Sequence, residues 1–207
     1  MIKNITLSTM TTMALFAIIG CGGSGVSSDN AKTGTGYYID SAVEGVEYTC
    51  GNQTGITDKD GKFAFEEGKG CSFSLAGITL RKVKADKLAN GQEVFEDNLT
   101  VAKLLQSIDA DGNPDNGIQI TDEVAKALKK SLEEEDCKGK FPQGDKLTEV
   151  VANVGHDVEH VSGDLRTDEE VREHWNRTHA EHEDQNHTHA EDNIEHSEKD
   201  DDSENHH

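Results

Sequence analysis

The chain contains few of the residues from which large hydrophobic cores are built. Hydrophobic residues make up 33% of its 207 positions and aromatic residues 5%, with one tryptophan and two prolines. A large core is therefore not expected, and the length allows one or two small domains. The longest apolar run, from Met13 to Ile19, is far shorter than the ~20 residues of a membrane-spanning helix.

Positive charge is also scarce. The chain has 41 acidic and 20 basic residues, a net charge of −21 at pH 7. Nucleic-acid backbones are excluded as partners because like charges repel, whereas cations are natural counterparts. The charge is uneven, since residues 156–207 hold 18 acidic residues, 4 basic residues and all ten histidines. This bias marks a change of composition near the C-terminal quarter.

The common motifs of nucleophilic and metal catalysis are missing. The chain contains no Gly-x-Ser-x-Gly, no His-Glu-x-x-His and no Cys-x-x-Cys. We therefore expect that the protein is not an enzyme.

The N-terminus has the order of a secretory signal, in which Lys3 precedes an apolar segment that ends at Ile18-Ile19-Gly20-Cys21. This end resembles the lipobox of the bacterial lipoprotein family. The resemblance implies a signal peptide over residues 1–20, cleavage before Cys21 and lipidation of the Cys21 sulfur, which would anchor the chain to a membrane. An ordinary signal peptide that happens to contain a cysteine is the alternative.

The resemblance also implies a location. In that family an aspartate after the cysteine tends to retain the protein at the inner membrane, and Gly22 stands there instead, so we expect the cell envelope and its outer membrane. Residues 21–36 are rich in Gly, Ser and Thr and predict a flexible tether. Residues 185–207 have no hydrophobic periodicity and predict a disordered acidic, histidine-rich tail.

Residues 37–97 contain short segments with apolar side chains at every second position, as in Phe63-Ala64-Phe65 and 71–75, separated by glycine-containing turns. This rhythm predicts a small β-sandwich, and with the helices described below an α+β fold. Because Cys50 and Cys71 both lie in this segment of an exported chain, we expect a disulfide between them and a free or intermolecular Cys137. Reduced cysteines that only pack are the alternative.

Residues 41–46 and 55–65 resemble the "V-x-G-V … G-x-T-D-x-x-G-x-F-x-F" pattern of carboxypeptidase-regulatory-like, or transthyretin-like, domains. The resemblance implies a non-catalytic module that spaces, stabilises or presents binding loops. The segment also looks like the N-terminal module of uncharacterised bacterial lipoproteins and adhesin-like proteins, in which a β-domain leads into a segment like Leu104–Ile118.

Residues 98–184 predict a helical region. Asn98, Thr121 and Thr167 are candidate N-caps, and Asp145 is the expected start of a further helix that Gly155 ends. Apolar residues recur at helical spacing after each start, and Trp175 is expected to anchor the last helix on the core.

The loop 109–115 between two predicted helices places oxygen-bearing side chains at alternate positions, and these are candidate Ca²⁺ ligands: Asp109, Asp111, Asn113 and Asp115. The loop departs from the EF-hand pattern, because Pro114 occupies the position of its glycine and Ile120 that of its bidentate Glu. Affinity is expected to be weak. An interhelix turn, in which Asp and Asn bond nearby backbone amides, is the alternative.

Histidines of the last predicted helix and tail are candidate ligands for Zn²⁺ or Ni²⁺: His174, His179, His182, His187 and His189. No spacing fixes a coordination geometry, so a polyvalent, low-affinity tail is expected. A solvated tail that keeps the protein soluble is the alternative.

These patterns together predict a membrane-anchored envelope lipoprotein that acts as a non-enzymatic, adhesin-like binding module with an unknown protein or glycan partner, modulated by divalent cations. The second hypothesis is an envelope buffer or carrier of divalent metals that uses the histidine-rich tail.

Overall fold

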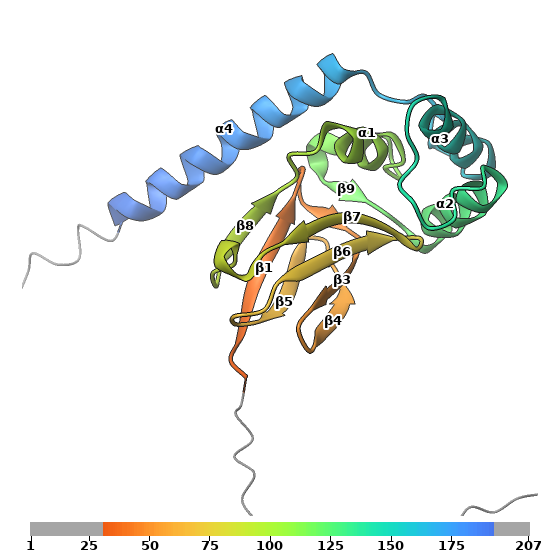
Figure 1. Ribbon diagram of the computed structural model, residues 1–207. Coiled ribbons are helices and arrows are strands. Elements are labelled where there is room, and N and C mark those ends of the chain that lie inside the picture. The colour runs from red at the N-terminus through yellow and green to blue at the C-terminus, as the bar shows by residue number, and fades with distance from the viewer. Residues whose placement is uncertain (1–30, 193–207) are drawn as a thin grey trace, which may run out of the picture. The chain divides into compact units, whose positions relative to one another are not determined.

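Two small β-sheets pack face to face and lead into a group of helices (Figure 1). The computed structural model describes residues 31–192, with only the backbone for 181–192. The predicted signal peptide, Cys21 and residues 193–207 lie outside this range. The elements are β1 (Thr33–Ile39), β2 (Val43–Glu44), β3 (Glu47–Cys50), β4 (Gln53–Ile56), β5 (Lys62–Glu66), β6 (Cys71–Leu75), β7 (Ile78–Val83), β8 (Gln92–Phe95), α1 (Leu99–Ser107), β9 (Ile118–Gln119), α2 (Asp122–Glu134), α3 (Asp145–Asp157) and α4 (Asp168–Asp192).

The sheets have the strand orders β5-β1-β8, β4-β3-β6-β7 and β2-β9. The four-stranded sheet is antiparallel, whereas β1 pairs antiparallel with β5 and parallel with β8. Aromatic side chains from both larger sheets meet in the core: the rings of Tyr38 and Phe73 stack at 4.6 Å, and Phe63 meets Phe73 edge-on at 4.9 Å. The α+β fold is thus confirmed, with a sandwich at its N-terminal half.

The first strand begins earlier than expected, which corrects the boundary of the tether predicted over 21–36. Residues 33–36 belong to β1 because Gly34 and Gly36 pair with Phe65 and Phe63 of β5. A Cβ atom at Gly34 would lie 2.4 Å from Cζ of Phe65, and one at Gly36 2.5 Å from Cζ of Phe63. The glycines therefore make room for two aromatic rings.

Each predicted helix start is found. Asn98 accepts hydrogen bonds from the amides of Thr100 and Val101, and Thr121 accepts one from Val124. Thr167 and Glu170 bond each other's backbone amides, the reciprocal pattern of a capping box at the start of α4. These bonds satisfy amides that the first turn of a helix leaves without partners.

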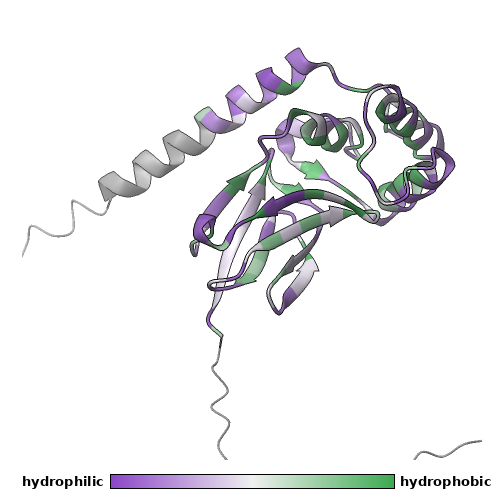
Figure 2. Ribbon diagram, in the orientation of Figure 1, coloured by the Kyte–Doolittle hydropathy of each residue, from purple (hydrophilic) through white to green (hydrophobic). Residues whose placement is uncertain are grey.

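Two helix ends differ from expectation. Gly155 does not end α3, which runs to Asp157. Its missing side chain instead lets the backbone of Gly163 approach the helix. Helix α4 continues to Asp192, so residues 185–192 are helical where disorder was predicted. Figure 2 shows that the described turns of α4 are largely hydrophilic.

A single hydrophobic core connects the strands with α1, α2 and α3. Strand β9, in the predicted helical region, pairs with β2 through Val43 and Ile118, both fully buried. The β-part and the helical part therefore belong to one compact unit.

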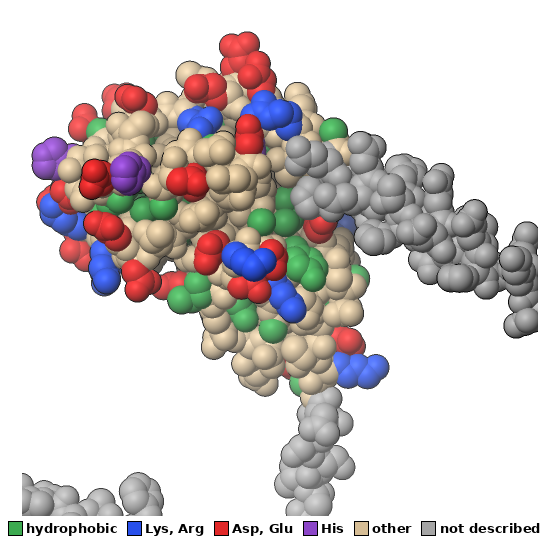
Figure 3. Space-filling view, turned by 180° about the vertical axis from the view of Figure 1, so that it is seen from behind, with side chains coloured by type: hydrophobic (Ala, Val, Ile, Leu, Met, Phe, Trp, Pro, Cys, Tyr) green, Lys and Arg blue, Asp and Glu red, His purple; other side chains and the backbone are tan. Residues whose placement is uncertain are grey.

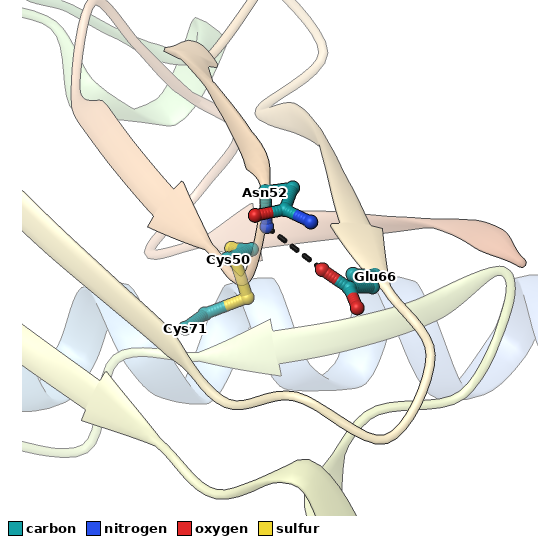
Figure 4. Close-up of a disulfide and its surroundings, with 4 residues drawn as sticks. All are labelled: Cys50, Asn52, Glu66 and Cys71. Carbon is teal, nitrogen blue, oxygen red and sulfur yellow. Dashed lines mark hydrogen bonds between the residues drawn. A yellow bond between two sulfur atoms is a disulfide. The ribbon is translucent and has the colours of Figure 1, made fainter. Parts of the chain in front are cut away.

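The expected disulfide is present. Cys50 and Cys71 lie opposite each other on β3 and β6, and their sulfurs are bonded (Figure 4). Beside it, Glu66 of β5 accepts a hydrogen bond from the backbone amide of Asn52 at 2.9 Å. The hairpin turn between β3 and β4 is thereby tied to both sheets. Cys137 is free and buried.

Candidate functional site

Polar side chains converge where β1 ends, and Asp40 is at their centre. Its carboxylate is almost fully buried and accepts hydrogen bonds from Nε1 of Trp175 at 2.6 Å and from Nε2 of Gln106 at 3.1 Å. Burial raises the pKa of Asp40 to about 8, although both hydrogen bonds favour its charged form. Asp40 thus holds α1 and α4 together at the end of a central strand.

His174 of α4 lies next to Asp40 and is 1% exposed. Its Nδ1 is 2.9 Å from Oδ1 of Asp115, and its Nε2 bonds the backbone carbonyl oxygen of Asp40. Carboxylate and carbonyl oxygens accept hydrogen bonds, so both ring nitrogens face acceptors in this arrangement. His174 therefore links α4, β1 and the loop before β9.

Ser41, His174 and Asp115 have the composition of a catalytic triad. The Ser41 Oγ lies 3.4 Å from Nε2 of His174, and with Arg177 and Thr178 these residues line a cavity of about 80 Å³. However, the Ser41 hydroxyl donates to the carbonyl oxygen of Pro114 at 2.7 Å, and Nε2 of His174 is already committed to Asp40. A general base needs a free lone pair on that nitrogen. The arrangement favours a structural role.

A second acidic group is buried near the first. Glu96 accepts hydrogen bonds from the Tyr38 hydroxyl at 2.5 Å, from the Asn98 amide at 2.8 Å and from the Arg81 guanidinium at 3.2 Å. Burial raises the pKa of Glu96, and burial together with the negative charge of Glu96 raises that of Tyr38. These bonds join β1, β7 and the start of α1 from inside the core.

The structure divides the four predicted calcium ligands into two groups. Asp115 contacts α4, through Nδ1 of His174 and Nη2 of Arg177 at 2.9 Å each, and its pKa is lowered by Arg177 first and His174 second. Asp109 and Asp111 remain together in the loop, where Oδ1 of Asp111 accepts a hydrogen bond from the Asn113 amide. The Asn113 backbone, rather than its side chain, joins the loop's hydrogen bonds.

The predicted metal-binding histidines are also separated. His174 has both nitrogens bonded to protein oxygens, and the ring of His179 stacks on Phe95 at 4.3 Å. His182, His187 and His189 belong to the part of α4 whose side chains are not described. Among the described residues, no group of three or more His, Cys, Asp or Glu is placed to hold a metal ion.

Two hollows lie along α2 and share Ala76 and Lys129, with volumes of about 350 and 270 Å³. Ile56, 61% exposed, lines the second and is the only large hydrophobic side chain in the described range that is exposed. Lysines and carboxylates both line these hollows, so charge selects no class of ligand there. On the face shown in Figure 3, acidic and basic side chains are likewise interspersed.

Sequence reasoning missed the central residues of this polar group, Asp40 and Gln106. An aspartate directly after the apolar stretch Tyr37-Tyr38-Ile39 was the available signal, since it places a carboxyl group at the end of a strand that is largely buried. Nothing in the sequence indicated partners 66 and 135 positions away.

Comparison with protein-family models, with curated proteins and with solved structures finds no match to this chain. Within residues 31–192, no helix is both long enough and apolar enough to span a bilayer. The function must therefore be argued from the residues themselves.

Proposed function

We propose that the protein is a lipid-anchored module of the cell envelope, at the outer membrane, that binds a protein or glycan partner without catalysing a reaction. The observation that carries this proposal is the order of its N-terminal parts: a short apolar segment, Gly20-Cys21, a brief polar stretch and then a folded unit that starts at Thr33. A lipidated Cys21 would be a durable anchor, because two or more acyl chains hold a protein stably on a membrane.

The spacing between anchor and fold supports this arrangement. Eleven residues, 22–32, separate Cys21 from β1. Even fully extended, they reach at most about 40 Å, since each residue spans at most ~3.6 Å. A unit held this way stays near the membrane surface.

Two features of the fold are consistent with an exported binding module. The disulfide between Cys50 and Cys71 joins adjacent strands of a sheet, and such bonds persist in oxidising compartments. The bonds of His174 favour a structural role for the Ser41, His174 and Asp115 group. Neither feature identifies the partner.

Labelling tests the anchor directly. Cells that express the native chain, Cys21→Ser or Cys137→Ser are grown with a labelled fatty acid and fractionated. We expect label and membrane association for the native chain and for Cys137→Ser, and neither for Cys21→Ser. An unlabelled native chain, or equal labelling of Cys21→Ser, would overturn the proposal.

A further inference from the structure

The loop between α1 and β9 contains a buried carboxylate oxygen without a hydrogen-bond partner. Asp109 is 0% exposed, and its Oδ1 accepts a hydrogen bond from the Gln119 amide at 2.8 Å. Its Oδ2 is buried and has no partner among the described residues. An unsatisfied buried polar atom destabilises a fold, and more strongly if the group is charged. Something outside the chain can satisfy this oxygen.

Asp109 and Asp111 belong to one tight turn after α1, in which the Gly112 amide donates a hydrogen bond to the backbone oxygen of Asp109 at 3.2 Å. The Asp109 carboxylate lies close enough to the Asp111 carboxylate and to the Asn113 amide for both to affect its pKa, which burial, as the larger cause, raises to about 6. Asp111 itself is exposed, and its Oδ2 accepts a hydrogen bond from Nδ2 of Asn116 at 2.9 Å. Two carboxylates are thus held side by side, one buried and one open to solvent.

The positive groups nearby are engaged elsewhere. Arg166 donates to the backbone oxygens of Gln106 and Gly112, at 3.2 and 3.3 Å, while His174 and Arg177 hold Asp115. Within the described range, no lysine or arginine forms an ion pair with Asp109 or Asp111. Adjacent carboxylates that lack a counter-ion repel each other unless a proton or a cation lies between them.

We infer that Asp109 and Asp111 form a site for one calcium ion at the closed end of the α1–β9 loop. Oxygen ligands and a partly open position suit a hard cation that retains water, and calcium tolerates irregular coordination better than magnesium does. Two carboxylates fall short of a complete protein ligand set, so water supplies the remaining positions. Ile120, where an EF-hand has its bidentate Glu, is 4% exposed and packs in the core.

The site has a structural consequence, because the same loop holds α4. The Asp109 contact to Gln119 closes the loop, and Asp115, six positions further on, bonds His174. An ion on Asp109 and Asp111 would stabilise the loop in the form that receives α4. This inference does not depend on the lipid anchor, so a failure of either proposal leaves the other intact.

Calorimetric titration of the full chain in detergent, at pH 7.5 and with Ca²⁺ up to about 10 mM, tests the site. We expect one saturable site with a Kd of about 10⁻⁴–10⁻³ M, the range of extracellular calcium modules. Asp109→Asn and Asp111→Asn should each weaken it at least about tenfold. Asp60→Asn is the matched control, because Asp60 is exposed, bonds the adjacent Lys59 and gives the same charge change.

A thermal melt with and without Ca²⁺ is a second measurement, which still tests the site if one variant folds poorly. Ca²⁺ should raise the melting temperature of the native chain and of Asp60→Asn, and leave that of Asp111→Asn unchanged. The inference would be overturned if the native chain showed no saturable binding of Ca²⁺, or if both loop variants bound Ca²⁺ as tightly as the native chain does. It would also be overturned if the native chain bound Mg²⁺ as tightly as Ca²⁺.

Discussion

The imidazole of His174 and the carboxylate of Asp115, 59 positions apart, lie 2.9 Å from each other, and this contact fastens α4 to the loop that precedes β9. The opposite nitrogen of the same ring bonds the main chain at the end of β1. One side chain therefore joins three distant parts of the sequence, and the first prediction concerns its loss.

His174→Ala should destabilise the protein by about 2 kcal/mol, because it leaves polar groups without partners at a buried position. The single tryptophan, Trp175, follows directly in α4 and bonds Asp40, so its fluorescence should shift to the red if α4 is released. Urea denaturation followed by this fluorescence measures both effects. His156→Ala is the control, since that exposed side chain lies on α3, and an equal loss in the control would contradict the assignment.

Removal of the disulfide should cost about 3 kcal/mol, the loop-entropy value for cysteines 21 positions apart. The double variant Cys50→Ala/Cys71→Ala should melt at a lower temperature than the native protein, and a reductant should lower only the native melting temperature. Calorimetry with and without dithiothreitol checks this. Cys137→Ser should keep its sensitivity to the reductant, and an insensitive native protein would contradict the prediction.

Asp40→Asn should change how stability depends on pH. Burial raises the pKa of Asp40 to about 8 in the folded protein, against ~3.9 in an unfolded chain. Between these values the folded protein keeps a proton that the unfolded chain releases, so this group lowers stability as pH rises, by up to ~1.4 kcal/mol per pH unit. Glu96 and Asp109, whose pKa values are also raised, act in the same direction.

The asparagine variant removes the Asp40 contribution, so its stability relative to the native protein should increase steadily from pH 5 to pH 8. Urea denaturation at each pH measures the difference. Asp97→Asn is a suitable comparison, because Arg81 lowers the pKa of that exposed carboxyl and its effect is confined to pH values below ~4. If the free energy of unfolding depended on pH in the same way for Asp40→Asn and for the native protein, this carboxyl would not titrate in the expected range.

Gly155→Ala should destabilise the protein by about 1–3 kcal/mol, although alanine normally favours a helix. A Cβ atom at this position would lie 2.2 Å from Cα of Gly163, a backbone atom that cannot move without shifting the segment before α4. Chemical denaturation of this variant measures the loss, with His156→Ala, at an exposed position of the same helix, as the control. A stabilised Gly155→Ala would refute the close approach.

The features predicted from the sequence were those that depend on neighbouring residues. Asn98, Thr121 and Thr167 cap their helices through amides two or three positions away, and a residue's type determines whether it can form such a bond. Phe63 and Phe65 show the period of two that a strand with one buried face requires. The disulfide followed from two cysteines in one strand-rich segment.

The errors came from contacts between distant residues. Glycine is common in linkers, so Gly34 and Gly36 favour a tether by composition, yet each faces an aromatic ring of β5. His174 has the chemistry of a metal ligand, and only the fold reveals the two oxygens that occupy its nitrogens. Asp40 follows an apolar stretch, but the partners that define its role lie 66 and 135 positions away.

The pairing of strands also determines when this chain can complete its structure. The central strand β1 pairs with β8, more than 50 positions later, and β2 pairs with β9. Asp40 accepts a hydrogen bond from Trp175, which is further still along the chain. Contacts between such distant positions slow folding, because the intervening chain must be ordered before they form. A nascent chain that has reached only residue 100 still lacks β9 and α4, so the unit closes late in its synthesis.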